Sequence, residues 1–244
     1  MIGRDAVRML YRAWRYRWKL DREEIRFVRR NLAPGDTAVD IGAHKGAYAY
    51  WMHRAVAPAG RVVCFEPQPE LAESLRRMKS ALRLDRLEVE SLALSSRSGE
   101  MTLTVPGRRS SPAGTLEAGL IAGPHAAYPV RVTTLDQHLG TESPVRLIKC
   151  DVEGHELEVF RGGEGLLRAW RPILLFECEE RHHRRHTSAD VFAFLEGLDY
   201  EGFYFARGGL RPLREFDPGL HGDPARAGYV NNFAFLPRAG RAWP

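Results

Sequence analysis

The stretch TAVDIGAHKG, residues 37–46, decides the fold of this 244-residue chain. The apolar residues around Asp40 predict a short buried strand, and Gly42 and Gly46, four residues apart, predict a tight turn that opens a helix. The N-terminus of such a helix offers free backbone N–H groups to a carboxylate or a phosphate. The acid at Asp40 and the missing third glycine of the dinucleotide pattern disfavour a pyrophosphate ligand, and therefore a nicotinamide oxidoreductase.

Strand and helix patterns alternate on the C-terminal side of this turn. Such an alternation requires a parallel sheet with right-handed crossovers, which is an α/β fold. The expected core strands are residues 61–66, 87–94, 146–151 and 172–178, and the expected helices are 46–56, 70–84, 156–170 and 189–198. Further strands are expected at 100–105, 130–134, 200–206 and 229–236.

Glu66 ends the second expected strand, 24 residues after Gly42. An acid at this place in a nucleotide-binding fold accepts hydrogen bonds from ribose hydroxyls. The helix N-terminus and Asp40 suit the carboxylate and the ammonium of an amino acid. S-adenosylmethionine carries both a ribose and an amino-acid end, so the two signals together favour that ligand.

A second polar cluster follows the strand at residues 146–151. The sequence LIKCDVEGHE, residues 147–156, runs from apolar strand residues into Asp151, Glu153, His155 and Glu156. Open α/β folds bind their ligands at the carboxyl edge of the sheet. These side chains are therefore expected beside Asp40 and Glu66.

Six short motifs lie along the chain: VDIGAxxGxY from residue 39, FEP at 65–67, TLD at 134–136, IKxDVEGxE at 148–156, FE at 176–177 and NNxxF at 231–235. Together they resemble the FkbM family of S-adenosylmethionine-dependent methyltransferases. The resemblance spans about residues 36–236 and implies a class I methyltransferase fold, a seven-stranded sheet with helices on both faces. It also implies an enzyme that methylates hydroxyl groups on small molecules, such as sugars or secondary metabolites.

The resemblance also implies a set of cofactor contacts, with an adenine-side contact near Ser95 and Asp151 beside the methyl group. His44 departs from the family, which usually has asparagine at that position. The implied cofactor-binding residues are Asp40, Gly42, Ala43, His44, Gly46, Glu66, Ser95 and Asp151.

Methyl transfer to a hydroxyl requires placement of the acceptor oxygen and removal of its proton. The candidates for this chemistry are Asp151, Glu153, His155 and Glu177. We favour His155 or Glu153 as the general base and Asp151 as the group that positions the acceptor.

No bound metal is expected, although two alternatives remain open. Asp151 and Glu177 end neighbouring strands and would suit a hard divalent cation that acidifies a hydroxyl. His182 and His186, four residues apart beside His183, have a spacing that binds zinc on a helix. The arginines among these histidines favour a solvated or substrate-facing loop instead.

The positive charge of the chain is concentrated at its start. Residues 1–30 hold ten basic and four acidic residues, so that a total net charge of +5 leaves the remainder at −1. Apolar and basic residues there recur at helical spacing on different faces. We predict a basic amphipathic helix over residues 1–34, packed on a methyltransferase domain over 35–237. The alternative is docking on a membrane surface or a second copy through Trp14 and Trp18.

A long segment rich in glycine and proline, residues 106–129, interrupts the second half of the domain. Segments of this length without secondary structure are often functional. We therefore predict a lid or acceptor pocket that includes Arg108 and Arg109; a disordered insertion is the alternative.

Other classes of protein are disfavoured. No apolar run is long enough for a transmembrane helix, and three isolated cysteines are typical of a reduced, cytoplasmic protein. A nucleic-acid methyltransferase is an alternative that the basic start of the chain favours. Nucleic acid is nevertheless not expected as a partner, because the acids after the strand at 146–151 would repel phosphate. A non-catalytic scaffold of the same fold remains an alternative, which the intact acids at Asp40, Glu66 and Asp151 disfavour.

Overall fold

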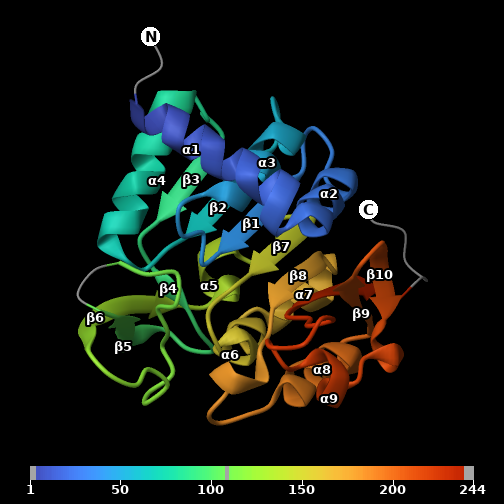
Figure 1. Ribbon diagram of the computed structural model, residues 1–244. Helices are drawn as coiled ribbons and strands as arrows, with labels where there is room; N and C mark the ends of the chain where they lie inside the picture. Colours follow the sequence, from blue (N-terminus) through green and yellow to red (C-terminus); the bar gives the residue numbers. More distant parts are fainter. Residues whose placement is uncertain (1–3, 108–109, 239–244) are drawn as a thin grey trace.

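A computed structural model describes residues 4–107 and 110–238 of the chain (Figure 1). The strands are β1 Thr37–Ile41, β2 Arg61–Phe65, β3 Leu87–Glu90, β4 Ala93–Leu94, β5 Gly99–Pro106, β6 His125–Thr133, β7 Leu147–Cys150, β8 Ile173–Glu177, β9 Tyr200–Ala206, β10 Gly209–Pro212 and β11 Asn232–Pro237. The α-helices are α1 Arg4–Arg15, α2 Arg22–Asn31, α3 Ala47–Val56, α4 Pro69–Leu82, α5 Leu135–Leu139, α6 Glu156–Arg161, α7 Glu164–Trp170, α8 Ser188–Gly197 and α9 Pro218–His221. Short 3-10 or π turns are η1 Tyr16–Leu20, η2 Glu180–His182 and η3 Leu213–Glu215.

The main sheet has the strand order β10-β9-β11-β8-β7-β1-β2-β3. Strands β3, β2, β1, β7 and β8 pair in parallel, and β11 lies antiparallel between β8 and β9. The predicted α/β fold is confirmed, but the sheet formed by the described residues has eight strands rather than seven. The additional strand, β10, forms a hairpin with β9 around Gly208, whose φ of 94° suits a tight turn.

Helices cover both faces of this sheet (Figure 1). On one face α1, α2, α3 and α4 enclose an apolar cluster that includes Met9, Ile25 and Met52. On the other face α5, α6, α7 and α8 enclose a second cluster that includes Leu157 and Phe176. The parallel strands are apolar on both sides because they lie between these two clusters.

The N-terminal segment is two helices rather than one. A π turn over η1 leads into Asp21, where the backbone leaves helical geometry at φ −117° and ψ 55°. The Asp21 carboxylate accepts a hydrogen bond of 2.9 Å from the Tyr48 hydroxyl, which fixes the bend on α3. The apolar residues Ala13 and Val28 are buried in the apolar cluster on this face of the sheet, so the segment packs on the sheet and its helices.

The segment at 106–129 is more ordered than the sequence predicts. Its last residues belong to β6, which begins at His125 and pairs with β5 in a small sheet of order β4-β6-β5. Thr115 pairs with Thr104 in an isolated bridge, so part of the connecting loop is held against β5. Arg108 and Arg109 lie outside the described residues, and the lid remains a prediction.

The helix predicted over 156–170 is also divided, at Gly162 and Gly163. A Cβ on Gly162 would lie 2.1 Å from the carbonyl oxygen of Ser95. Glycine here therefore lets the end of α6 approach the chain after β4. No helix within the described residues is long and apolar enough to cross a membrane.

Candidate cofactor and active site

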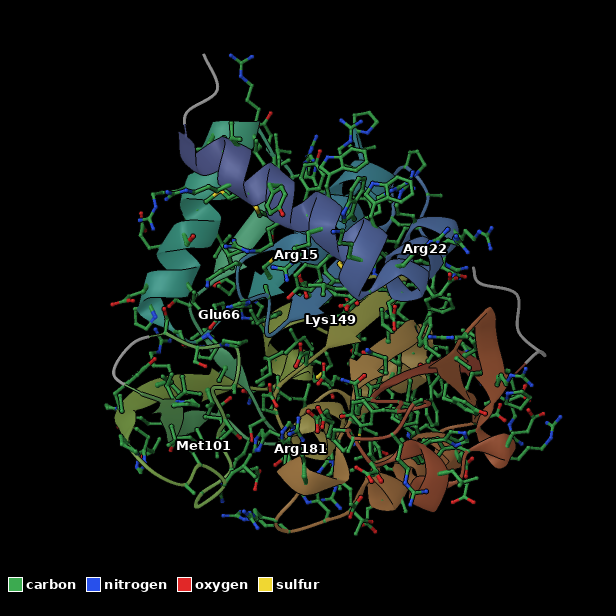
Figure 2. All side chains as sticks on the ribbon, viewed as in Figure 1. Arg15, Arg22, Glu66, Met101, Lys149 and Arg181 are labelled. Atoms are coloured by element: carbon green, nitrogen blue, oxygen red, sulfur yellow. The ribbon has the colours of Figure 1, made fainter. Side chains whose placement is uncertain are left out.

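A cavity of about 350 Å³ lies at the carboxyl ends of β1, β2, β7 and β8. Figure 2 shows Glu66 and Lys149 in the centre of the molecule, between the N-terminal helices and the smaller sheet that carries Met101. The walls hold more carboxylates than cations: the acids Asp21, Asp40, Glu66, Asp151, Glu153 and Glu177 against Arg12, Lys45 and Lys149. This balance suits a cationic ligand.

The turn after β1 forms one end of the cavity. The Gly42 amide donates to the Phe65 carbonyl at 2.9 Å, and the Asp151 amide donates to the Ile41 carbonyl at 3.1 Å. Gly42 has φ +71°, and a Cβ there would lie 1.9 Å from the Asp151 carbonyl oxygen. Only glycine allows the ends of β1 and β7 to approach so closely.

The other predicted cofactor-binding residues of this turn are Ala43, His44 and Gly46, and not all of them reach the cavity. Ala43 and His44 line the cavity, whereas Gly46 does not. Gly46 caps α3 with φ 76°, and a Cβ there would lie 2.4 Å from the Met78 side chain. Its role is to let α3 start close to α4. The Nε2 atom of His44 is buried and has no hydrogen-bond partner among the described residues.

Asp40 is fully buried in the cavity wall. Its Oδ1 atom lies 3.7 Å from Lys149 Nζ, which is too long for a hydrogen bond. Burial raises its pKa to about 6, although the charge of Lys149 opposes the shift. The oxygens of this carboxylate can therefore still accept hydrogen bonds from a cationic group of a ligand.

Glu66 is held by the backbone on both sides. Its Oε2 accepts from the His44 amide at 2.8 Å and its Oε1 accepts from the Gln68 amide at 2.9 Å. Burial raises its pKa to about 7, while these two hydrogen bonds act in the opposite direction. The carboxylate therefore has a fixed orientation at the end of β2, with lone pairs left for a ligand.

Lys149 is a site residue that the sequence analysis missed. Its side chain is buried, and Nζ lies 3.2 Å from Asp151 Oδ2 and 3.4 Å from the Gly42 carbonyl oxygen. Burial lowers the lysine pKa, but the charges of Asp151 and Asp40 outweigh it and raise the pKa above its ordinary value. The signal was a lysine inside the buried strand LIKC.

The N-terminal segment also supplies a wall of the cavity, through Arg12 and Tyr16. No pattern in the sequence indicates this contact, because it depends on how separate elements pack. Pro112 and Leu116 line the cavity from the 110–124 loop, which is part of the segment predicted as a lid or acceptor pocket.

The acids after β7 and β8 are brought together as predicted. Asp151, Glu153 and Glu177 all line the cavity. Glu153 pairs with His182, whose Nδ1 lies 2.7 Å from Oε2. Burial, together with the nearby charge of Asp151, raises the pKa of Glu177 well above its ordinary value. Because Asp151 is already paired with Lys149, the proposed cation between Asp151 and Glu177 gains no support.

His155 and Ser95 lie behind the cavity rather than in its wall. The imidazole is buried between two partners, with Nε2 2.9 Å from Ser95 Oγ and Nδ1 2.6 Å from Glu117 Oε1. Neither residue lines the cavity. This arrangement favours a role for His155 in holding the loop that follows β7.

Replacing Ser95 by alanine is expected to lower the free energy of unfolding by about 1–3 kcal/mol, because it leaves a buried imidazole nitrogen without a partner. Urea denaturation measures this change. The matched control is Ser91→Ala at an exposed serine, which should change stability by less than about 0.5 kcal/mol. If both substitutions change the free energy of unfolding equally, Ser95 does not form a stabilising hydrogen bond with His155.

Comparison with known proteins places the chain in a family. Residues 40–201 match the family model of the methyltransferase FkbM domain, which covers well over half of the chain. The chain belongs to the FkbM methyltransferase family. The resemblance seen in the sequence is confirmed. No curated protein is significantly similar to the chain.

Several solved structures share the fold. A methyltransferase FkbM from Methylobacillus flagellatus KT is 18% identical with a TM-score of 0.53; the similarity covers 96% of this chain and 55% of that one. An rRNA methylase from Streptococcus thermophilus is 11% identical with a TM-score of 0.52, covering 88% and 93%. Cofactor-bound Rv0187 from MTB is 16% identical with a TM-score of 0.51, covering 98% and 91%. The chain thus spans about half of the first of these proteins.

The cofactor of this FkbM-family chain is S-adenosylmethionine. The cavity fits it in charge, because a sulfonium and an ammonium meet a wall rich in carboxylates. It also fits in hydrogen bonding, because the buried oxygens of Asp40 and the Nε2 of His44 have no hydrogen-bond partner among residues 4–107 and 110–238.

Proposed function

We propose that this protein transfers a methyl group from S-adenosylmethionine to a hydroxyl of a small molecule. The observation that carries the proposal is the acidic cavity at the carboxyl edge of the sheet, where Asp40, Glu66 and Asp151 meet. A surface of this charge would repel a phosphate backbone, which disfavours nucleic acid as the acceptor. The intact acids also disfavour a non-catalytic scaffold.

We assign the two ends of the cofactor to two ends of the cavity. Asp40 and the turn at Gly42, Ala43 and His44 would take the amino-acid end, and Glu66 would accept hydrogen bonds from the ribose hydroxyls. Gly46 and Ser95 would not contact the cofactor, since neither lines the cavity; they would only hold neighbouring parts of the chain in place.

The bound cofactor supplies an electrophilic methyl group on a sulfonium. The protein must then hold the acceptor oxygen in line with that methyl and remove its proton. We assign the positioning to Asp151, which Lys149 holds at 3.2 Å, and the role of base to Glu153, which lines the cavity and pairs with His182. His155 is proposed as a positioning residue, because it lies outside the cavity wall.

The test of this function is a product with one added methyl on oxygen. The protein is incubated with S-adenosylmethionine that carries a ¹³C methyl and with pools of hydroxylated small molecules. We expect an O–CH₃ carbon signal and a mass gain of one methyl, both lost with Glu153→Gln. An N–CH₃ signal would overturn the choice of hydroxyl, and an unchanged rate for Glu153→Gln would overturn the assigned base.

The affinity for S-adenosylhomocysteine is expected to fall as the pH drops below about 7. Burial raises the pKa of Glu66 to about 7 and of Asp40 to about 6, and a ligand that donates to both favours their ionised forms. Binding at low pH must therefore release protons. Calorimetry should find an affinity at least about tenfold weaker at pH 5.5 than at pH 8.

Proton release gives an independent check of this pH dependence. The apparent enthalpy of binding at pH 6 should differ between buffers of different ionisation heat. Glu66→Gln should flatten the profile between pH 6 and 8, because it removes the group that titrates there. An affinity that is constant from pH 5.5 to pH 8 would contradict the assignment of both carboxylates.

The N-terminal segment is proposed as part of the methyltransferase unit, because Arg12 and Tyr16 line the cavity. The predicted boundary between residues 34 and 35 would then mark a change in amino-acid composition and not a boundary between two functional units. Docking or dimerisation through Trp14 and Trp18, which are 44% and 56% exposed, stays a prediction. A cytoplasmic location also remains a proposal.

A further inference from the structure

Three buried side chains with metal-binding chemistry meet behind the cavity. Glu156 begins α6, Cys178 follows β8, and His183 follows η2. One ligand atom from each lies within 4.8 Å of the other two. Within the described residues, no other group of three or more histidine, cysteine, aspartate or glutamate side chains meets this criterion.

The separations match those around a tetrahedral ion. Cys178 Sγ lies 3.2 Å from His183 Nε2, and His183 Nε2 lies 3.9 Å from Glu156 Oε2. Zinc bonds of about 2.3 Å to sulfur and about 2.0–2.2 Å to nitrogen or oxygen place neighbouring ligands about 3.3–3.6 Å apart. The two measured distances bracket this range, so small side-chain movements would complete the geometry.

The hydrogen bonding of these groups is incomplete. The side chains of Glu156 and His183 are each 1% exposed, yet Glu156 Oε2 and His183 Nδ1 have no hydrogen-bond partner within residues 4–107 and 110–238. The other oxygen of Glu156 is held by the Gly154 amide at 3.1 Å, which directs Oε2 toward His183. A buried carboxylate oxygen without a partner is costly, and a cation would satisfy it.

We propose that Glu156, Cys178 and His183 bind one zinc ion. A thiolate, an imidazole and a carboxylate together select zinc over magnesium or calcium, which prefer oxygen ligands alone. Binding forms a zinc–sulfur bond and releases the thiol proton of Cys178 to solvent. His186 is the nearest fourth ligand, because its ring centroid lies 5.7 Å from that of His183 and its Nε2 is buried without a partner among the described residues; otherwise a water completes the shell.

Such an ion would fix the floor of the active site. It would join the start of α6 to the segment that runs from the end of β8 to the loop after η2, 22 or more residues further along the chain. His182 directly precedes the ligand His183, and its partner Glu153 lies three residues before the ligand Glu156. The zinc is therefore structural, and its effect on the cavity would pass through the position of this pair.

The experiment uses untagged full-length protein, stripped of metal by a chelator and titrated with Co²⁺ and then with Zn²⁺. We expect one equivalent of Co²⁺ to give a thiolate-to-cobalt charge-transfer band and tetrahedral d–d bands, which one equivalent of Zn²⁺ abolishes. Cys178→Ala should remove the charge-transfer band and reduce tightly bound zinc at least about tenfold. Cys64→Ala removes another buried cysteine of the core and should change neither.

The result that overturns the proposal is equally direct. Wild-type protein that takes up no Co²⁺ with a thiolate band has no such site. Tight zinc binding that persists in both Cys178→Ala and His183→Gln would place the metal elsewhere. Circular dichroism of each variant shows whether it is folded, and the wild-type cobalt spectrum decides the question even if a variant is not.

Discussion

Replacing Glu66 by alanine is expected to weaken S-adenosylhomocysteine binding by at least about 100-fold. Two hydrogen bonds from ribose hydroxyls to a charged carboxylate contribute about 1.5–3 kcal/mol each, so losing both removes two or more decades of affinity. The substitution also frees the His44 and Gln68 amides, which Glu66 now holds at 2.8 and 2.9 Å. Isothermal titration calorimetry at pH 8 measures the change.

The matched control is Glu70→Ala. Glu70 is exposed in the first turn of α4, four residues from Glu66, and does not line the cavity. Its loss should leave the affinity within about twofold of the wild type. If Glu66→Ala binds as tightly as this control, the ribose is not held at the end of β2.

Replacing Lys149 by methionine is expected to lower the free energy of unfolding by about 3–5 kcal/mol. The side chains have similar volume, so packing is largely kept. The loss comes from Asp40 and Asp151, which lose the cation that lies 3.7 and 3.2 Å away. A buried carboxylate without a counter-charge is strongly destabilising. Urea denaturation at pH 8 measures the effect.

The loss of stability in Lys149→Met is expected to grow as the pH rises. Without the lysine, the pKa of Asp40 in the folded state rises further above its unfolded value, so stability falls as the pH rises through it. The deficit of Lys149→Met should therefore be larger at pH 8 than at pH 5.5. Lys79→Met in α4 is the control, since Lys79 forms no ion pair within the described residues. A deficit below about 1 kcal/mol would show that the three charges do not form a coupled group.

The sheet and the edge of the site are predictable because they follow from local patterns. Each parallel core strand ends in a polar residue or is followed directly by a polar residue or a glycine, and parallel strands bring their carboxyl ends to one edge. The sequence therefore predicts that Asp40, Glu66 and Asp151 lie together. Their meeting in one cavity follows from the register of β1 with β2 and β7.

The parts that were missed depend on packing between distant elements. Lys149 faces Asp40 and Asp151 because of its strand register, and the sequence alone shows only a lysine in an apolar run. The sequence predicts His155 as a candidate base, whereas in the structure its Nδ1 lies 2.6 Å from Glu117 Oε1, in the loop predicted as a lid, and His155 does not line the cavity. The split of the N-terminal helix at Asp21 depends on the Tyr48 hydroxyl in α3.

The candidate zinc ligands could not be predicted from the sequence for the same reason, since they depend on packing between elements. The spacing of His182 and His186 predicts a pair on a helix, but the chain there is a 3-10 turn followed by an irregular segment. His182 faces Glu153 and His183 faces Cys178 instead. Cys178 and His183 are five residues apart in the chain, but only the fold brings Glu156 to them from the start of α6.

The most direct measurement is a calorimetric titration of the wild-type protein with S-adenosylhomocysteine and, separately, with NAD⁺. The acidic cavity at Asp40, Glu66 and Asp151 predicts binding of one S-adenosylhomocysteine per chain and no detectable binding of NAD⁺, whose pyrophosphate meets carboxylates. Binding of NAD⁺ with no binding of S-adenosylhomocysteine would contradict the account.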